Sequence, residues 1–159
     1  MLKNIALSLV AVALLQVSAS AGTGIFGSFV VLDLGAGQQF YDLGSATPNP
    51  DYSSLNGSVF DPAVPGSFTF TLLGGELNTF KNNSGGSNDV GTPTLLYSIT
   101  SGGTSGNFSV PFSAGFPSFG NNPGDQKWQT LSQNVNLLQG LAPGNYTANI
   151  RLTAPTGVD

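Results

Sequence analysis

The carboxylates are the side chains of this sequence that could take part in acid–base chemistry. The 159 residues include eight Asp or Glu and four Lys or Arg, but neither His nor Cys. The sequence therefore excludes a Ser-His-Asp triad, a Cys-His dyad, a Cys/His zinc site and a disulfide framework. Two carboxylates alone can serve as acid and base in glycosidases. Here the acids show no paired spacing and mostly adjoin Gly, Pro, Asn or Ser, as in turns. We expect a protein that is not an enzyme.

Calcium binding is the metal chemistry that remains open, because hard cations take carboxylate and amide oxygens. Asp51, Asp61, Asp89 and Asp125 all lie near asparagines in predicted loops. The spacing of an EF-hand is absent, and Asn/Asp loops without metal are common. We expect no cofactor. If calcium is bound, the candidate ligands are Asp125, Asn121 and Asn122.

Aromatic rings could support sugar binding, in which a ring stacks on the sugar face. The rings that lie outside the alternating patterns are Trp128, Tyr41, Tyr52 and Phe119. Trp128 stands between Lys127 and Gln129, which is consistent with partial exposure. The favoured alternative is that Trp128 is a core residue between two sheets, a frequent feature of immunoglobulin-like sandwiches.

Charge and targeting signals define the environment. A net charge of −4 argues against nucleic-acid binding, which needs Lys and Arg. Residues 1–21 read as a signal peptide, with Lys3, an apolar stretch at 5–15 and the small-x-small site Ala19-Ser20-Ala21. An uncleaved membrane anchor is the alternative. We expect cleavage, export to the cell surface or medium, a single domain over 22–159 and no further membrane span.

The composition predicts an all-β domain. The chain holds 22 Gly and 10 Pro, so ordinary helices have little room, and its 10% aromatic content is too high for a disordered linker. Apolar and polar residues alternate in several segments, including a predicted strand with Phe108, Val110 and Phe112, and most regularly over 145–152. Gly35-Ala36-Gly37 is expected to turn the strand 28–34 back into a strand near 39–43. Gly74-Gly75 is expected to form either a tight turn or a bulge in one continuous strand. We count seven or eight strands, with loops at 44–66, 82–93, 101–107 and 113–124.

The segment before the most regular strand predicts how that strand is fixed. Leu141, the Pro143-Gly144 turn and Tyr146 have the form of a tyrosine corner, in which the Tyr hydroxyl bonds the backbone a few residues upstream. This element resembles the L-x-P-G-x-Y motif of fibronectin type III and other immunoglobulin-like domains.

A wider resemblance covers almost all of the chain after residue 21. It rests on 74–83 (GGELNTFKNN), 95–99 (LLYSI), 124–128 (GDQKW) and 135–141 (VNLLQGL), in that order. Together these runs resemble an immunoglobulin-like β-sandwich module of large secreted bacterial proteins. Such modules accompany nuclease, adhesive or sorting domains and usually have no assigned activity. The resemblance implies an antiparallel β-sandwich and an exported location, and it supplies no catalytic residues.

The resemblance also implies one more strand than the sequence provides. In an immunoglobulin-like sandwich the tyrosine-corner strand, strand F, is followed by a strand G that pairs beside it. Only 153–159 follow the predicted strand F here, and they contain Pro155 and Gly157. We expect either a fragment of a longer protein, an edge completed by another strand, or a miscounted strand.

These observations give three functional hypotheses. The first is a non-catalytic, exported accessory module that presents loops or a sheet face to a protein or glycan partner. The second is a carbohydrate-binding module that uses Trp128 and nearby polar residues. The third is a fibre or matrix subunit that self-associates through the edge at Arg151 and Leu152.

Overall fold

The computed structural model describes residues 24–44, 51–58, 60, 69–80, 90–100, 102–142 and 144–155. The expected signal peptide lies outside these residues. The described part contains strands and no helix. The strands are β1 (Gly24–Asp33), β2 (Gln38–Asp42), β3 (Ser53–Ser54), β4 (Thr71–Phe80), β5 (Thr94–Ile99), β6 (Ser105–Ser109), β7 (Phe112–Gly115), β8 (Asp125–Thr130), β9 (Val135–Asn136) and β10 (Ala148–Thr153).

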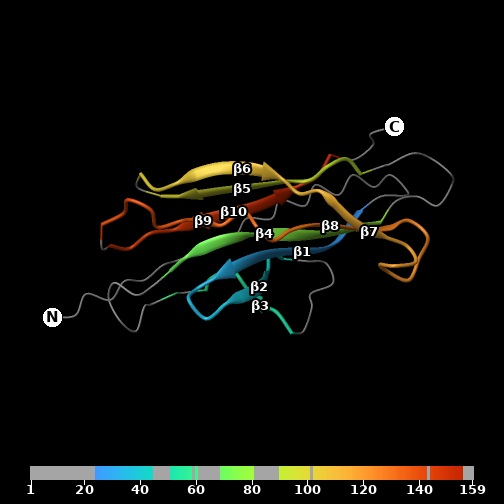
Figure 1. Ribbon diagram of the computed structural model, residues 1–159, viewed down its shortest axis with the longest axis horizontal. Helices are drawn as coiled ribbons and strands as arrows, with labels where there is room; N and C mark the ends of the chain where they lie inside the picture. Colours follow the sequence, from blue (N-terminus) through green and yellow to red (C-terminus); the bar gives the residue numbers. More distant parts are fainter. Residues whose placement is uncertain are drawn as a thin grey trace.

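The strands form two sheets that make a β-sandwich (Figure 1). The larger sheet has the order β3-β2-β1-β4-β8-β7, with β9 pairing with β4, and the smaller has the order β10-β5-β6. All pairs are antiparallel except β2 with β3. The expected all-β sandwich is therefore confirmed. The strand count exceeds the expected one partly because β3 and β9, with two residues each, are too short to show an alternating pattern.

The first hairpin follows the prediction. β1 pairs with β2 through a turn at 34–37, and the Asp33 carboxylate accepts the N–H of Gly35 at 2.7 Å and of Gly37 at 3.1 Å. A short carboxylate side chain often stabilises a turn in this way, by bonding nearby backbone amides.

The Gly74-Gly75 pair lies inside one strand, which is the bulge alternative. The register of β4 against β1 shifts between Val31 and Leu32, which pair with Gly74 and Leu72. Gly74 has a φ of 151°, and a Cβ there would lie 1.9 Å from the Thr130 carbonyl oxygen. Only glycine can adopt this backbone conformation and leave room for the carbonyl group at the end of β8.

The alternation of Phe108, Val110 and Phe112 predicted one strand, and this prediction is wrong. Phe108 belongs to β6 in the smaller sheet, whereas Phe112 begins β7 in the larger sheet. The chain changes sheets at Val110-Pro111, where Val110 donates its N–H to Pro93 and Pro111 accepts from Gln129. Proline has no N–H for a ladder, so it marks the break between strands. The strands also take in 105–107 and 113–115, which were expected to be loops.

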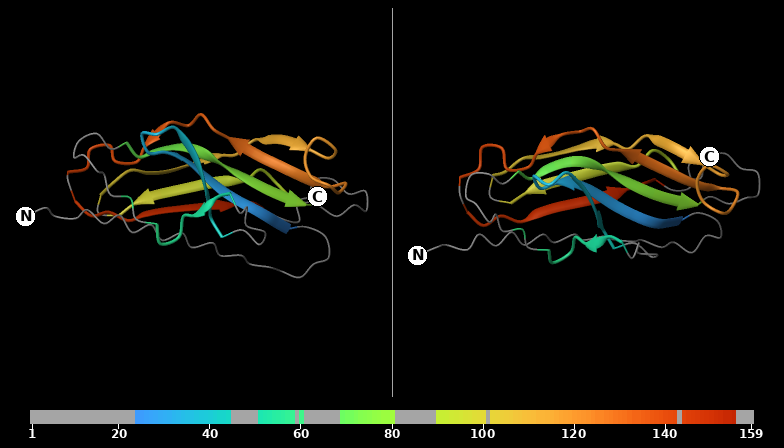
Figure 2. Two further views of the ribbon diagram at one scale, coloured as in Figure 1. Left: turned by 90° about the horizontal axis from the view of Figure 1, so that it is seen from below. Right: turned by 60° about the horizontal axis from the view of Figure 1, so that its bottom comes forward.

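The core lies between the two sheets. It joins Val30, Leu32, Leu72 and Leu77 of the larger sheet to residues of the smaller sheet such as Leu95 and Ile150. Burying a side chain of this size stabilises the fold by about 1.5–3 kcal/mol relative to leaving it exposed. In both views of Figure 2, β10 lies at the margin of the smaller sheet.

Candidate functional site

The rings proposed for sugar binding are not brought together in one site. Trp128 is 5% exposed, and its indole N–H donates to the Thr79 hydroxyl at 3.0 Å. Tyr41 also belongs to the buried core, where burial raises the pKa of its hydroxyl. Neither ring has a face open for stacking, so the geometry favours the core alternative for Trp128.

The other two rings pack against neighbouring aromatic side chains. Tyr52 stacks on Phe40 with ring centroids 5.1 Å apart and meets Phe29 edge-on at 5.1 Å. Phe119 stacks on Phe26 at 6.2 Å, and the Lys127 ammonium lies 5.9 Å from its centroid. These contacts connect loops to strands, and they leave the four candidate residues divided between the core and the surface of the larger sheet.

Asp125 holds its own loop instead of facing other acids. Its Oδ2 accepts the backbone N–H groups of Asn121, at 2.9 Å, and of Asn122, at 3.0 Å. A calcium ion needs oxygen ligands, whereas this contact is made by N–H donors. Across the described ranges, no three Asp or Glu residues gather into a possible metal site. Asp61 and Asp89 lie outside the described residues.

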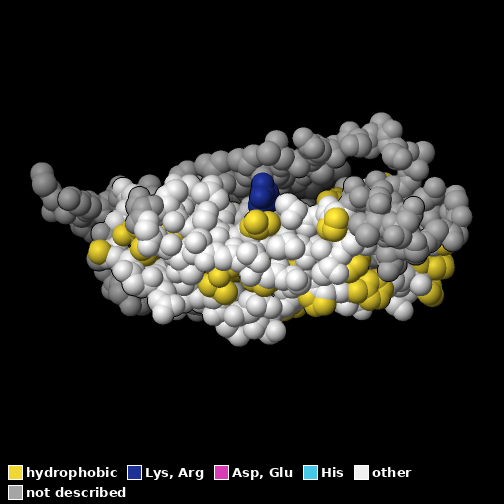
Figure 3. Space-filling view, turned by 90° about the horizontal axis from the view of Figure 1, so that it is seen from above, with side chains coloured by type: hydrophobic (Ala, Val, Ile, Leu, Met, Phe, Trp, Pro, Cys, Tyr) yellow, Lys and Arg dark blue, Asp and Glu magenta, His cyan; other side chains and the backbone are white. Residues whose placement is uncertain are grey.

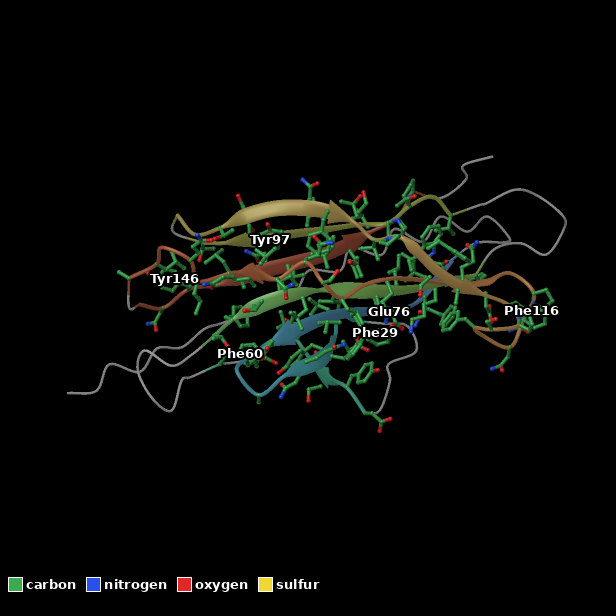
Figure 4. The ribbon with its side chains drawn as sticks, viewed as in Figure 1. Phe29, Phe60, Glu76, Tyr97, Phe116 and Tyr146 are labelled. Carbon is green, nitrogen blue, oxygen red and sulfur yellow. The ribbon has the colours of Figure 1, made fainter. Side chains whose placement is uncertain are left out.

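Sequence reasoning did not find the polar cluster formed by β4 and β8. The Glu76 carboxylate accepts from Gln129 at 2.6 Å and from Asn78 at 3.1 Å, and it pairs with Lys127 at 2.8 Å. Glu76 and Phe29 are labelled in Figure 4. The available signal in the sequence was spacing. Glu76 and Asn78 are two residues apart on one strand, as are Lys127 and Gln129 on the other, and residues two apart share a face of a sheet. Three donors occupy the carboxylate, so the cluster ties β4 to β8.

The tyrosine corner fixes the start of β10. The Tyr146 hydroxyl donates to the Ala142 carbonyl at 2.6 Å, four residues upstream, as expected of this element. Leu141 packs against the core. Gly144 lies so close to the tyrosine ring that a Cβ there would be 3.2 Å from the hydroxyl oxygen. Figure 4 shows Tyr146 at one end of the molecule and Phe116 at the other. Pro143 lies outside the described residues.

The outer edge of β10 is the candidate functional site. β10 pairs with β5 over six residues without a register shift, and no other described strand pairs with it. Thr100 donates its N–H to the Thr147 carbonyl, and Ile99 donates its own to Thr104 on the β6 side. Antiparallel hydrogen bonds alternate along a strand. Asn149, Arg151 and Thr153 therefore bond to β5, whereas Ala148, Ile150 and Leu152 direct their N–H and C=O groups away from it.

The side chains of β10 alternate between the two faces of the smaller sheet. Ala148 and Ile150 are buried and Leu152 is half-buried, whereas Arg151 and Thr153 are exposed. Figure 3 looks down on the side where the smaller sheet lies; white and yellow atoms cover most of its described surface, and no acidic side chain is in view. The candidate site therefore combines an apolar inner side, backbone groups with which no described strand pairs, and the Arg151 guanidinium.

The other edge strands are shorter. β3 has two residues and β6 has five. β7 has four, follows Pro111, and carries a register shift between Phe112 and Ala114. Short strands, prolines and bulges are the means by which proteins keep exposed edges from pairing. β10 has none of these, and only Arg151 introduces a charge.

The chain matches no model of a known protein family, no curated protein and no solved structure. Within the described ranges, no helix is long and apolar enough to span a bilayer.

Proposed function

We propose that this chain is an exported, non-catalytic, immunoglobulin-like module that binds its partner by adding a β-strand to the outer edge of β10. The observation that carries the proposal is the regular six-residue edge described above. Strand addition to a sheet edge is a common mode of peptide recognition, in which the main-chain hydrogen bonds supply affinity. Export is supported by the signal-like sequence at 1–21.

The strand order supports the immunoglobulin-like assignment. In chain order, β1, β4, β5, β7, β8 and β10 take the places of strands A, B, C, D, E and F. The sheets β1-β4-β8-β7 and β10-β5 then correspond to A-B-E-D and F-C, and β6 takes the place of C′. In this fold strand G pairs with strand F. The edge of β10 is thus the place where the architecture accepts another strand.

The energy for binding would come from groups that β10 already holds in place. An added strand would bond the outward N–H and C=O groups of Ala148, Ile150 and Leu152. Each bond would contribute about 0.5–1.5 kcal/mol net. Because β5 fixes β10 along its whole length, the module itself loses little conformational entropy on binding.

Amide hydrogen exchange tests the proposal directly. In the isolated monomer the amides of Ile150 and Leu152 should exchange faster than those of Asn149, Arg151 and Thr153, which bond to β5. The first two amides should become protected when a strand is supplied. Slow exchange of Ile150 and Leu152 in the isolated monomer would contradict the proposal, since the edge would then be covered already.

A further inference from the structure

We infer that the strand accepted by β10 is a peptide segment of a partner protein with the pattern apolar–acidic–apolar, whose acidic residue faces Arg151. This inference rests on the proposed function and deepens it by specifying the partner.

The hydrogen-bond pattern places Arg151 at the position where side chains approach most closely. On the outer side of β10, an antiparallel strand would form its hydrogen-bonded pairs with Ala148, Ile150 and Leu152. Arg151 would then belong to a non-hydrogen-bonded pair, in which the Cα atoms are only about 4.5 Å apart. The residue facing Arg151 therefore lies within easy reach of its guanidinium.

The surroundings of Arg151 favour an acid at this place. Arg151 is exposed, and in the described part of the chain no carboxylate forms an ion pair with it. Its cross-strand neighbours are Leu96 on β5 and, beyond it, Asn107 on β6, both uncharged. A carboxylate in the added strand would give Arg151 a partner of opposite charge, which no described residue supplies. Cross-strand pairs of opposite charge strengthen pairing by about 1.4- to fivefold.

The two flanking positions of the partner strand should be apolar. They would face Ile150, which is 2% exposed, and Leu152, which is half-buried. A Cβ on Gly75 of β4 would lie 3.3 Å from Leu152 Cδ1, so the larger sheet lies directly beneath this end of β10. Side chains of the added strand that point inward would extend this apolar layer, where an unpaired polar group would be costly.

A second copy of the chain fits the site poorly. Its described edge strands β3, β6, β7, β9 and β10 read SS, SGNFS, FSAG, VN and ANIRLT, and none contains an acid. Leu32-Asp33-Leu34 and Tyr41-Asp42-Leu43 have the required pattern, but both are already paired on two sides. Leu32 and Asp33 pair with β2 and β4, and Tyr41 and Asp42 pair with β1 and β3. Pairing of two β10 strands centred on Arg151 would place like charges opposite each other.

A tethered strand provides the test, because a short linker gives an effective concentration in the millimolar range. The peptide Thr-Val-Glu-Val-Thr is fused through a Gly/Ser linker after Asp159 of the full chain, since an antiparallel strand that follows β10 begins beside Thr153. Matched versions carry Gln or Lys in place of Glu. The readouts are exchange of the Ile150 and Leu152 amides and the denaturation midpoint, each also measured with Arg151→Glu.

We expect protection to fall in the order Glu, Gln, Lys with Arg151, and to reverse with Arg151→Glu. Equal protection by all three strands would overturn the acidic preference while leaving strand addition intact. Protection by none of them would overturn the proposed function together with this inference. Protection of the untethered chain that rises with protein concentration would show that a second copy occupies the edge, and it would overturn the choice of partner.

Discussion

β7 and β10 are edge strands of different sheets, and they differ in how readily another strand could pair with them. β7 has four residues, follows Pro111 and is interrupted by a register shift. Its Phe112 is 54% exposed, and Phe116 just beyond it is 47% exposed. β10 has six residues in unbroken register, with its apolar side chains turned inward. Exposed apolar rings and an unbroken edge strand are therefore separate features: the rings lie at β7, whereas the unbroken edge is that of β10.

The largest expected effect comes from the inward side of β10. Ile150→Ala should lower the free energy of unfolding by about 2–4 kcal/mol, because it removes buried methyl groups and leaves a cavity in the core. Urea denaturation of the monomer measures this loss. Phe112→Ala is the matched control on β7 and should cost clearly less, since more than half of that ring is exposed. Equal losses would mean that β10 is no better packed than β7.

Proline substitutions test the assigned direction of the backbone groups on β10. Arg151→Pro removes an N–H that bonds to β5 and should cost about 2 kcal/mol or more. Leu152→Pro removes an outward N–H and should cost less, while weakening the capture of a tethered strand. The measurements are urea denaturation and amide exchange of the fused chains. If Leu152→Pro proves the more disruptive of the two, the assignment of outward and inward groups is reversed.

The tyrosine corner should contribute less than the core. Tyr146→Phe deletes the hydroxyl that donates to Ala142 and should lower the free energy of unfolding by about 1 kcal/mol. Exchange of the β10 amides should speed up with it, because the corner fixes where the strand begins. Tyr52→Phe is the control, since it keeps the ring contacts of a tyrosine remote from β10. Equal effects of the two variants would show that the hydrogen bond of the tyrosine corner does not stabilise β10.

The sequence predicted the features that depend on local alternation and turn chemistry. Residues 145–152 indicated a strand, Gly35-Ala36-Gly37 indicated a hairpin turn, and Tyr146 indicated a corner. The sequence could not show that the chain changes sheets at Pro111, because the alternation of Phe108, Val110 and Phe112 continues across the break. The sequence favoured a core position for Trp128 but could not decide against an exposed one, since burial depends on pairing with Leu77 on a strand about fifty residues away. The outward direction of the Ile150 and Leu152 amides follows only from the pairing of β10 with β5.

The smallest expected effect concerns the exposed rings beside β7. Phe116→Ser should change the free energy of unfolding least, by about 0.5 kcal/mol, because 47% of the residue is already exposed. It should lower the fluorescence of a dye that binds exposed apolar surface, and it should leave the protection of Ile150 and Leu152 by a tethered strand unchanged. Exposed aromatic rings attract partners without specifying a register, whereas an edge strand sets register through its hydrogen bonds. If Phe116→Ser instead weakened strand capture, the rings near β7 and the edge of β10 would have to act together, and the distinction between the two regions would fail.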